Sequence, residues 1–231
     1  MAGRQETKPL TRVRAERVTQ TRGAIMSAAE RLFAEQGLSA VSNRQIGEAA
    51  GQGNVTAVSY HFASRAVLVR AIMAGHGEAT DLIRKRYLDE IGDSEDIRDW
   101  VDCLVRPGPE YLDSLGVPSW HARFAVQVMT DPLLRAIVTD EALVRPYLQQ
   151  TLEGLGRRLH LLSAQVRAER AAMARDLITH ACAERERTLA DGRVPLQDSW
   201  QHMADSLCDA LVGLFTAPVT SPHNHLEDTG S

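Results

Sequence analysis

A run of short polar side chains between residues 42 and 62 has the residue types that bind base edges and phosphate oxygens. If a helix runs from about residue 54 to about residue 61, then Val55, Val58 and Phe62 fall at a spacing that buries them on one side. The polar side chains are then left on the outer faces. The candidate residues for contact with nucleic acid are Ser42, Asn43, Arg44, Gln52, Asn54, Thr56, Ala57, Ser59, Tyr60, His61 and Arg65.

A second short helix would position this polar helix. Ser42 suits an N-cap, and Gln45 three residues later can complete a capping box ahead of the apolar Ile46. Gly51 then permits the left-handed backbone that ends one helix and lets another leave at a steep angle. Two short helices joined by a glycine turn favour a helix-turn-helix. An amphipathic helix over residues 21–36 would brace both.

The order of these motifs resembles the N-terminal domain of the TetR family of transcriptional regulators, over roughly residues 20 to 75. The matching residues are Ile25, Ala28, Ala29, Leu32, Phe33, Ala34, Glu35, Gly37, Ile46 to Gly51, Tyr60, His61, Phe62, Ser64, Arg65 and Leu68. Gly47 departs from the family's usual Ala, and the segment from Gly51 to Phe62 is one residue longer than its commonest form. The family's usual phosphate-contacting Tyr falls on Ser59, beside Tyr60.

Charge is unevenly distributed along the chain. Residues 1 to 70 hold ten Lys or Arg against five Glu, a net charge of +5, whereas the whole chain has −4 and the remainder therefore −9. A protein with this polarity can bring one end to a phosphate backbone and keep the other away. Asymmetry of this size also arises by chance in soluble chains.

Composition predicts a soluble protein of the reducing cytoplasm. The chain has 231 residues, 44% of them apolar, without a run long enough to cross a membrane. It opens without a secretory signal, and Cys103, Cys182 and Cys208 have no paired spacing.

The helical pattern continues almost to the end, which predicts an all-α fold without strands. We expect a flexible basic arm at 1–19, a DNA-binding domain at 20–75, a helical effector-binding and dimerisation domain at 76–216, and a disordered tail at 217–231. Pro146 lies inside one expected helix and should either kink it or begin it. The helices expected beyond residue 63 are 64–75, 77–91, 94–105, 118–129, 132–139, 141–160, 163–190 and 195–216.

Aromatic and sulfur residues gather in the middle of the chain. In the TetR family the corresponding helices enclose a small-molecule pocket, so the resemblance implies an effector site here, although such residues are more often plain core. An apolar ligand with one polar group would suit them. The candidate ligand-binding residues are Trp100, Cys103, Leu104, Tyr111, Trp120, His121, Phe124, Val128 and Met129.

Two apolar stripes mark the last two long helices. A twofold copy of this pair would close a four-helix bundle, which is the dimer interface that the resemblance implies. An internal core explains either stripe alone equally well. The candidate interface residues are Met173, Leu177, Trp200, Met203, Leu207, Leu211 and Leu214.

The sequence contains no recognisable motif for catalysis, for a cofactor or for a metal. Its eight His are scattered, and neither a His-Glu-x-x-His nor a Cys-x-x-Cys pattern occurs. We therefore expect no enzyme, no cofactor and no metal site. The sequence favours a homodimeric repressor that an apolar small-molecule effector releases from a palindromic double-stranded DNA operator. The alternative is a helical ligand carrier or protein-binding adaptor that keeps the fold without operator control.

Overall fold

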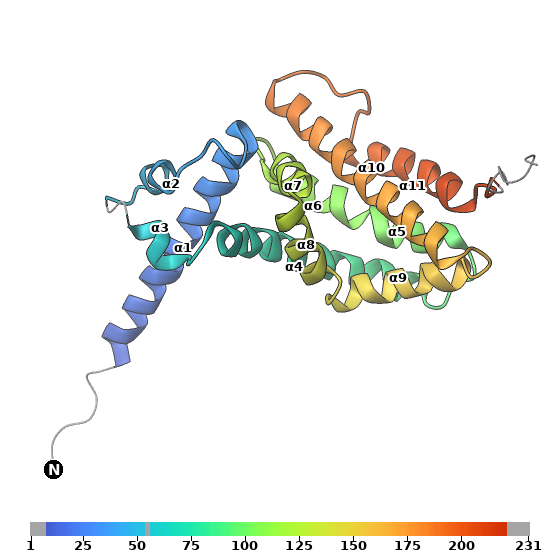
Figure 1. Ribbon diagram of the computed structural model, residues 1–231, viewed down its shortest axis with the longest axis horizontal. Coiled ribbons are helices and arrows are strands. Elements are labelled where there is room, and N and C mark those ends of the chain that lie inside the picture. Colours follow the sequence, from blue (N-terminus) through green and yellow to red (C-terminus); the bar gives the residue numbers. More distant parts are fainter. Residues whose placement is uncertain (1–7, 54–55, 221–231) are drawn as a thin grey trace, which may run out of the picture.

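The computed structural model describes residues 8–53 and 56–220, and over these residues the chain forms eleven helices and no strand. This confirms the predicted all-α fold. No helix among the described residues combines the length and apolar content needed to cross a bilayer. The helices are α1 (Lys8–Gln36), α2 (Asn43–Ala49), α3 (Ala57–His61), α4 (Arg65–Ile91), α5 (Ile97–Val105), α6 (Pro107–Leu115), α7 (His121–Thr130), α8 (Pro132–Ala142), α9 (Pro146–Arg158), α10 (Ala164–Ala190) and α11 (Trp200–Thr216) (Figure 1).

The first three helices gather at one end of the molecule, and α4 runs from them into the larger body formed by the later helices (Figure 1). Their core is made of apolar side chains that the amphipathic pattern predicts will face inward, such as Ile25, Phe33 and Ile46. Phe124 and Val128 of α7 belong to the same core. The N-terminal helices are therefore packed directly onto the rest of the chain.

A second core occupies the C-terminal body. Trp100 and Cys103 of α5 lie in it with residues of α4, α6, α9, α10 and α11. Helix α5 packs against both α9 and α11, and α10 packs against α7 and α11. Because α7 contacts α1 on one side and α10 on the other, it connects the two cores.

Several helix boundaries differ from the prediction. Residues 8–19, expected to be a flexible arm, continue α1, because extending a formed helix through good helix formers costs little. Helix α4 runs through Gly75, where a break was expected. Helix α6 was not predicted, although Pro107 at its start is compatible with a first turn. Pro146 begins α9 rather than kinking it.

Candidate nucleic-acid interface

Helix α2 and the glycine that follows it have the predicted local structure. The Ser42 hydroxyl accepts a hydrogen bond from the backbone N–H of Gln45 at 3.3 Å, and the Gln45 side chain accepts one from the Ser42 N–H at 2.9 Å. This is the expected capping box. Gly51 has φ +69°, a left-handed conformation that a side chain would strain. The cap and the glycine fix where α2 begins and where it ends.

Helix α3 buries one side and exposes the other. Val58 and Phe62 are buried in the N-terminal core, whereas Ser59 and Tyr60 are exposed, Tyr60 to 78%. Thr56, which precedes the helix, is also exposed. Asn54, predicted to contact bases, lies outside the described residues. The described helix begins at Ala57, three residues later than expected.

Arg22 of α1 holds the end of α3 in place, a contact that the sequence did not indicate. Its Nη1 donates a hydrogen bond to the backbone carbonyl of His61 at 3.0 Å. Its guanidinium also lies over the Phe62 ring, 4.2 Å from the centroid. A cation suits the C-terminal carbonyls of a helix, which have no partner within it. The His61 ring itself is half-buried and edge-on to Tyr60.

The two arginines predicted to contact phosphates have different surroundings. Arg44 is exposed on α2 and forms an i,i+4 ion pair with Glu48 at 2.8 Å. Arg65 is half-buried and donates hydrogen bonds to the carbonyls of Leu38 and Val41 in the loop after α1. Its guanidinium also lies over the Phe33 ring. Arg65 therefore joins α4 to the α1–α2 loop, which makes it a support of the fold rather than a free phosphate contact.

Residues 25–72, which include this capped and buttressed helix-turn-helix, match the profile of the family described as "Bacterial regulatory proteins, tetR family". The N-terminal domain of this chain belongs to the TetR family. No curated protein matches the chain significantly.

One solved structure extends the similarity in fold to the rest of the chain. The chain is similar to a TetR family transcription regulator from Marinobacter aquaeolei VT8, at 16% identity and a TM-score of 0.53, over 86% of this chain and 97% of that chain. It also matches RolR (NCGL1110), solved with the ligand resorcinol, at 18% identity and a TM-score of 0.46, over 89% and 98% of the two chains. The first similarity supports a TetR-type fold for the C-terminal body.

The residues predicted to line a TetR-type effector pocket do not surround one cavity. Trp100 and Cys103 are buried in the C-terminal core, with Leu104 packed against it. Phe124 and Val128 belong to the N-terminal core, where Phe124 stacks on Phe33 at 6.0 Å between ring centroids. The predicted set is therefore shared between the two cores, because one face of α7 packs against α1.

The other candidates of that set have other partners. Met129 packs against the N-terminal core, and Trp120 donates from Nε1 to the Glu35 carboxylate at 3.2 Å. Tyr111 and His121 lie near each other at the junction of α6 and α7. Two surface hollows near Arg157 and Leu162 contain none of the nine predicted residues.

The seven residues predicted to form the dimer interface fall into two groups. Trp200, Met203, Leu207 and Leu211 are buried within their own subunit, and Leu214 packs against the same core. Helices α5 and α6 cover these α11 residues, which favours the alternative of an internal core for this stripe. The α10 residues behave differently.

Met173 and Leu177 of α10 remain exposed, to 55% and 42%. They lie on one face of the helix, four residues apart. Of the residues predicted to form the dimer interface, Met173 and Leu177 are therefore the ones that remain available to a second subunit.

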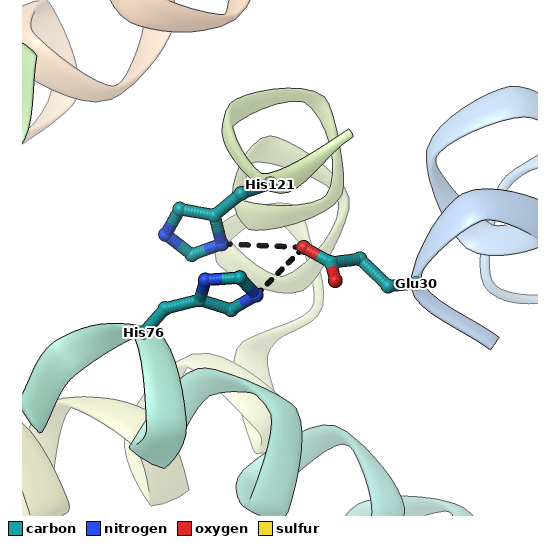
Figure 2. A group of neighbouring side chains, drawn as sticks. All are labelled: Glu30, His76 and His121. Carbon is teal, nitrogen blue, oxygen red and sulfur yellow. Dashed lines mark ion pairs between the residues drawn. The ribbon is translucent and has the colours of Figure 1, made fainter. Parts of the chain in front are cut away.

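A compact polar cluster lies where α1, α4 and α7 meet (Figure 2). Nε2 of His76 is 2.8 Å from Oε1 of Glu30, and Nδ1 of His121 is 3.6 Å from the same oxygen. Burial alone would raise the pKa of the Glu30 carboxyl, but the two imidazoles outweigh it and hold the pKa at about 2. Burial lowers the pKa of His121. The three members of this cluster are far apart along the chain, so no local sequence pattern indicated it.

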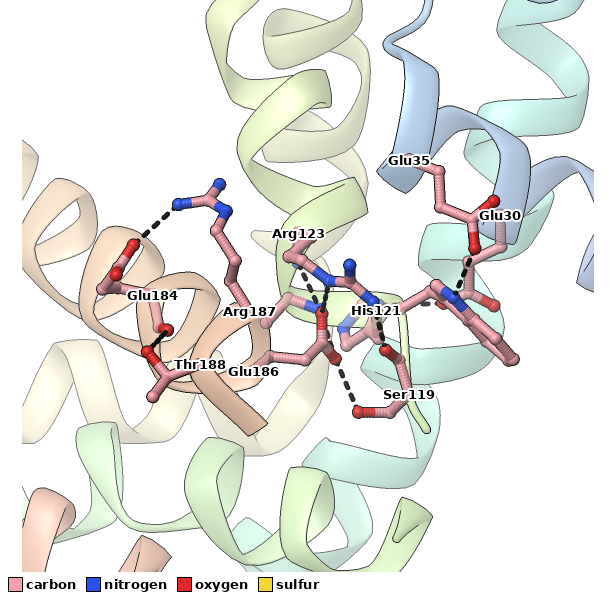
Figure 3. A network of polar contacts seen from close by, with 11 residues as sticks. Glu30, Glu35, Ser119, His121, Arg123, Glu184, Glu186, Arg187 and Thr188 are labelled. Carbon is pink, nitrogen blue, oxygen red and sulfur yellow. Dashed lines mark hydrogen bonds and ion pairs between the residues drawn. The ribbon is translucent and has the colours of Figure 1, made fainter. Parts of the chain in front are cut away.

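A second polar network joins α7 to α10 (Figure 3). The buried carboxylate of Glu186 accepts hydrogen bonds from the Ser119 hydroxyl at 2.8 Å and from the backbone N–H of Ala122 at 3.2 Å. It also accepts from the backbone N–H of Arg123 at 2.9 Å and pairs with its guanidinium at 3.3 Å. With its charge compensated in this way, Glu186 fixes the position of α7 relative to α10.

Proposed function

We propose that this TetR-type chain is a sequence-specific transcriptional regulator that binds double-stranded DNA in the cytoplasm. The observation that carries the proposal is that α3 has a buried and an exposed side: Val58 is buried, whereas Ser59 and Tyr60 are exposed. Polar side chains on an exposed short helix, held by a capped turn, suit insertion into a major groove.

The candidate contact residues divide into two roles. Thr56 and Ala57, at the beginning of α3, would meet base edges, and Asn54 is proposed for the same role from the sequence alone. Arg44 with Ser59 and Tyr60 would contact phosphates, together with Ser42, Asn43, Gln52 and His61 around the turn. Arg65 is left out of this set because its guanidinium is bonded to two loop carbonyls.

We propose that the regulator is a homodimer whose interface includes the exposed face of α10. Burying Met173 and Leu177 against a second copy would remove both from water. A twofold dimer presents two α3 helices to successive major grooves, so the operator should be near-palindromic.

As a repressor, the dimer would leave its operator when an effector binds better to a form that cannot hold DNA. The rival function is that of an adaptor or ligand carrier that keeps the fold without binding DNA. Salt dependence separates the two, because neutralising phosphates releases counterions and makes DNA affinity fall steeply with salt.

The experiment is selection of bound duplexes from a random pool, followed by affinity measurements over a range of salt. We expect a near-palindromic consensus, and we expect Arg44→Ala to flatten the slope of log affinity against log salt by about 0.9 for each phosphate contact that is lost. Arg193→Ala is the matched control, since Arg193 is an exposed arginine paired with a neighbouring acid outside the helix-turn-helix. Failure to enrich any sequence, with weak binding that is equal for both variants, would favour the adaptor.

A further inference from the structure

Three side chains of metal-binding type converge between the N-terminal helices and the C-terminal body. Glu30 comes from α1, His76 from α4 and His121 from α7, and one ligand-type atom of each lies within 4.8 Å of the others. Figure 2 shows both imidazoles directed toward the Glu30 carboxylate. All three residues are only partly accessible to solvent.

One atom of the cluster has no hydrogen-bond partner. Nδ1 of His121 is buried and its nearest charged neighbour, Oε1 of Glu30, is 3.6 Å away, beyond hydrogen-bonding range. A buried polar atom without a partner is costly, and native proteins rarely leave one. A cation between this nitrogen and the carboxylate would satisfy both.

Tyr111 supplies the outer contact that a histidine ligand usually has. Its hydroxyl lies 2.8 Å from Nδ1 of His76, on the side of the ring away from Glu30. A hydroxyl both donates and accepts, so it holds either tautomer of His76. With the proton on Nδ1, donated to Tyr111, the lone pair of Nε2 faces Glu30. Such outer hydrogen bonds orient ligating histidines and strengthen them.

We propose that Glu30, His76 and His121 bind one divalent transition-metal ion, with Zn²⁺ as the best match to two imidazoles and one carboxylate. Imidazole nitrogen suits Zn²⁺, Cu²⁺ and Ni²⁺, whereas Mg²⁺ and Ca²⁺ prefer oxygen ligands. Three protein ligands leave a fourth position for water or for a further ligand.

A divalent ion requires an ionised carboxylate and neutral imidazoles as ligands, and Glu30, His76 and His121 supply one carboxylate and two imidazoles. Among the described residues, no carboxylate other than that of Glu30 lies within ion-pair distance of His76 or His121.

Binding an ion would rearrange the cluster. The two imidazoles are now stacked, with centroids 3.8 Å apart and planes 20° apart, so their in-plane lone pairs cannot both reach one ion. Two ligands of a tetrahedral zinc at about 2.1 Å lie roughly 3.4 Å from each other, wider than the present 2.8 Å between His76 and Glu30. The rings must turn apart and the Glu30–His76 contact must lengthen.

This rearrangement would act on the DNA-binding helices, a step that rests on the proposed function. Glu30 lies on α1, the same helix whose Arg22 holds the end of α3. His76 lies on α4 and His121 on α7, two helices that pack in the C-terminal body. An ion that changes how α1 sits on α4 and α7 therefore biases the placement of α3, which couples metal affinity to DNA affinity by one common factor.

The first test is Zn²⁺ binding by the full chain without DNA. After chelator treatment and desalting, calorimetric titration and metal analysis should give one Zn²⁺ per chain, and Co²⁺ should give the visible absorption of a four-coordinate site. His76→Gln and His121→Gln should each abolish this stoichiometric binding, and Tyr111→Phe should weaken it by about 10- to 100-fold. His202→Ala, an exposed histidine on α11, is the matched control and should bind as the wild type does.

Circular dichroism of each variant shows whether it is folded, and Glu30→Gln provides a third ligand variant if one histidine variant unfolds. Absence of stoichiometric binding in the wild type, or binding unchanged in all folded ligand variants, would overturn the site and leave Glu30–His76 as an ion pair.

The second test measures DNA affinity on a selected operator with and without Zn²⁺. We expect a change of at least about fivefold in the wild type and none in His121→Gln. Metal binding without this change overturns the coupling and leaves the metal site standing. If the chain binds the metal but binds no DNA, the proposed function is overturned instead. Failure of the coupling and failure of the proposed function are therefore distinguishable.

Discussion

The backbone N–H of Arg123 donates a hydrogen bond to the Glu186 carboxylate at 2.9 Å, which makes a residue of α10 the cap of α7. Trp120, at the N-cap position of α7, provides no side-chain cap. The first N–H groups of a helix have no acceptor within the helix and need one from outside it. The helix dipole favours a negative charge at that end. Glu186, with 2% of its surface exposed, thus stabilises α7 from a distant part of the chain.

Replacing Glu186 by Ala should destabilise the protein by about 3–5 kcal/mol, because it removes the carboxylate that compensates the Arg123 guanidinium and leaves the backbone N–H groups of Ala122 and Arg123 without this acceptor. Urea unfolding followed by circular dichroism measures the change. Glu184→Ala is the control on the same helix. Glu184 is exposed, and among the described residues its carboxylate pairs with Arg187 alone, so its loss should cost less than about 0.5 kcal/mol. Equal effects of the two variants would contradict the capping role.

Local signals in the sequence predicted the N-terminal helices well. The capping box of Ser42 and Gln45 and the positive φ of Gly51 depend on residues a few positions apart, so a single sequence contains the information. The same holds for the apolar spacing in α1 that buries Ile25 and Phe33.

Contacts between distant residues could not be read in this way. Glu186 caps a helix that begins 65 positions earlier in the sequence, and nothing in its neighbourhood indicates that role. The stripe of α11 could be assigned to either a dimer or a core, and the unpredicted helix α6 helps to make it core. His76 and His121 come together only through the packing of α4 against α7.

Arg65→Ala should lower the stability of the folded protein. Its guanidinium donates to the carbonyls of Leu38 and Val41, so its loss leaves two loop acceptors without this donor, at a cost of about 1–3 kcal/mol. Arg44→Ala, at an exposed i,i+4 pair, should leave the melting temperature within error. Thermal unfolding of both variants provides the comparison. If the melting temperature of Arg65→Ala equalled that of the wild type, Arg65 would not support the fold and would again be a candidate phosphate contact.

Charges placed on α10 and on α11 should have different consequences for the proposed dimer. Leu177→Glu puts a carboxylate on an exposed face, so the chain should fold and the dimer should dissociate. Leu207→Glu places the same charge in the core of one subunit, where several kcal/mol of unpaired charge should prevent folding. Sedimentation and circular dichroism distinguish the two outcomes. A folded Leu177→Glu dimer with wild-type affinity would move the interface away from α10.

Two glycines of α9 should respond in opposite directions to the same substitution. A Cβ at Gly154 would collide with the indole of Trp100, a buried ring in the C-terminal core, whereas a Cβ at Gly156 would meet nothing within 4 Å. Gly154→Ala should therefore destabilise the protein by about 1–3 kcal/mol through overpacking. Gly156→Ala should stabilise it by roughly 0.5–1 kcal/mol, because Ala is the better helix former.

Urea unfolding of both alanine variants, with tryptophan fluorescence as a second probe of the Trp100 environment, tests this contrast. Trp100 also donates from its indole nitrogen to the carbonyl of Ser94 at 2.9 Å, so it has little freedom to move away from a new methyl group. If Gly154→Ala were as stable as the wild type, α9 would have to lie farther from α5 than this packing allows. The opposite signs of the two substitutions therefore measure how closely α9 approaches Trp100.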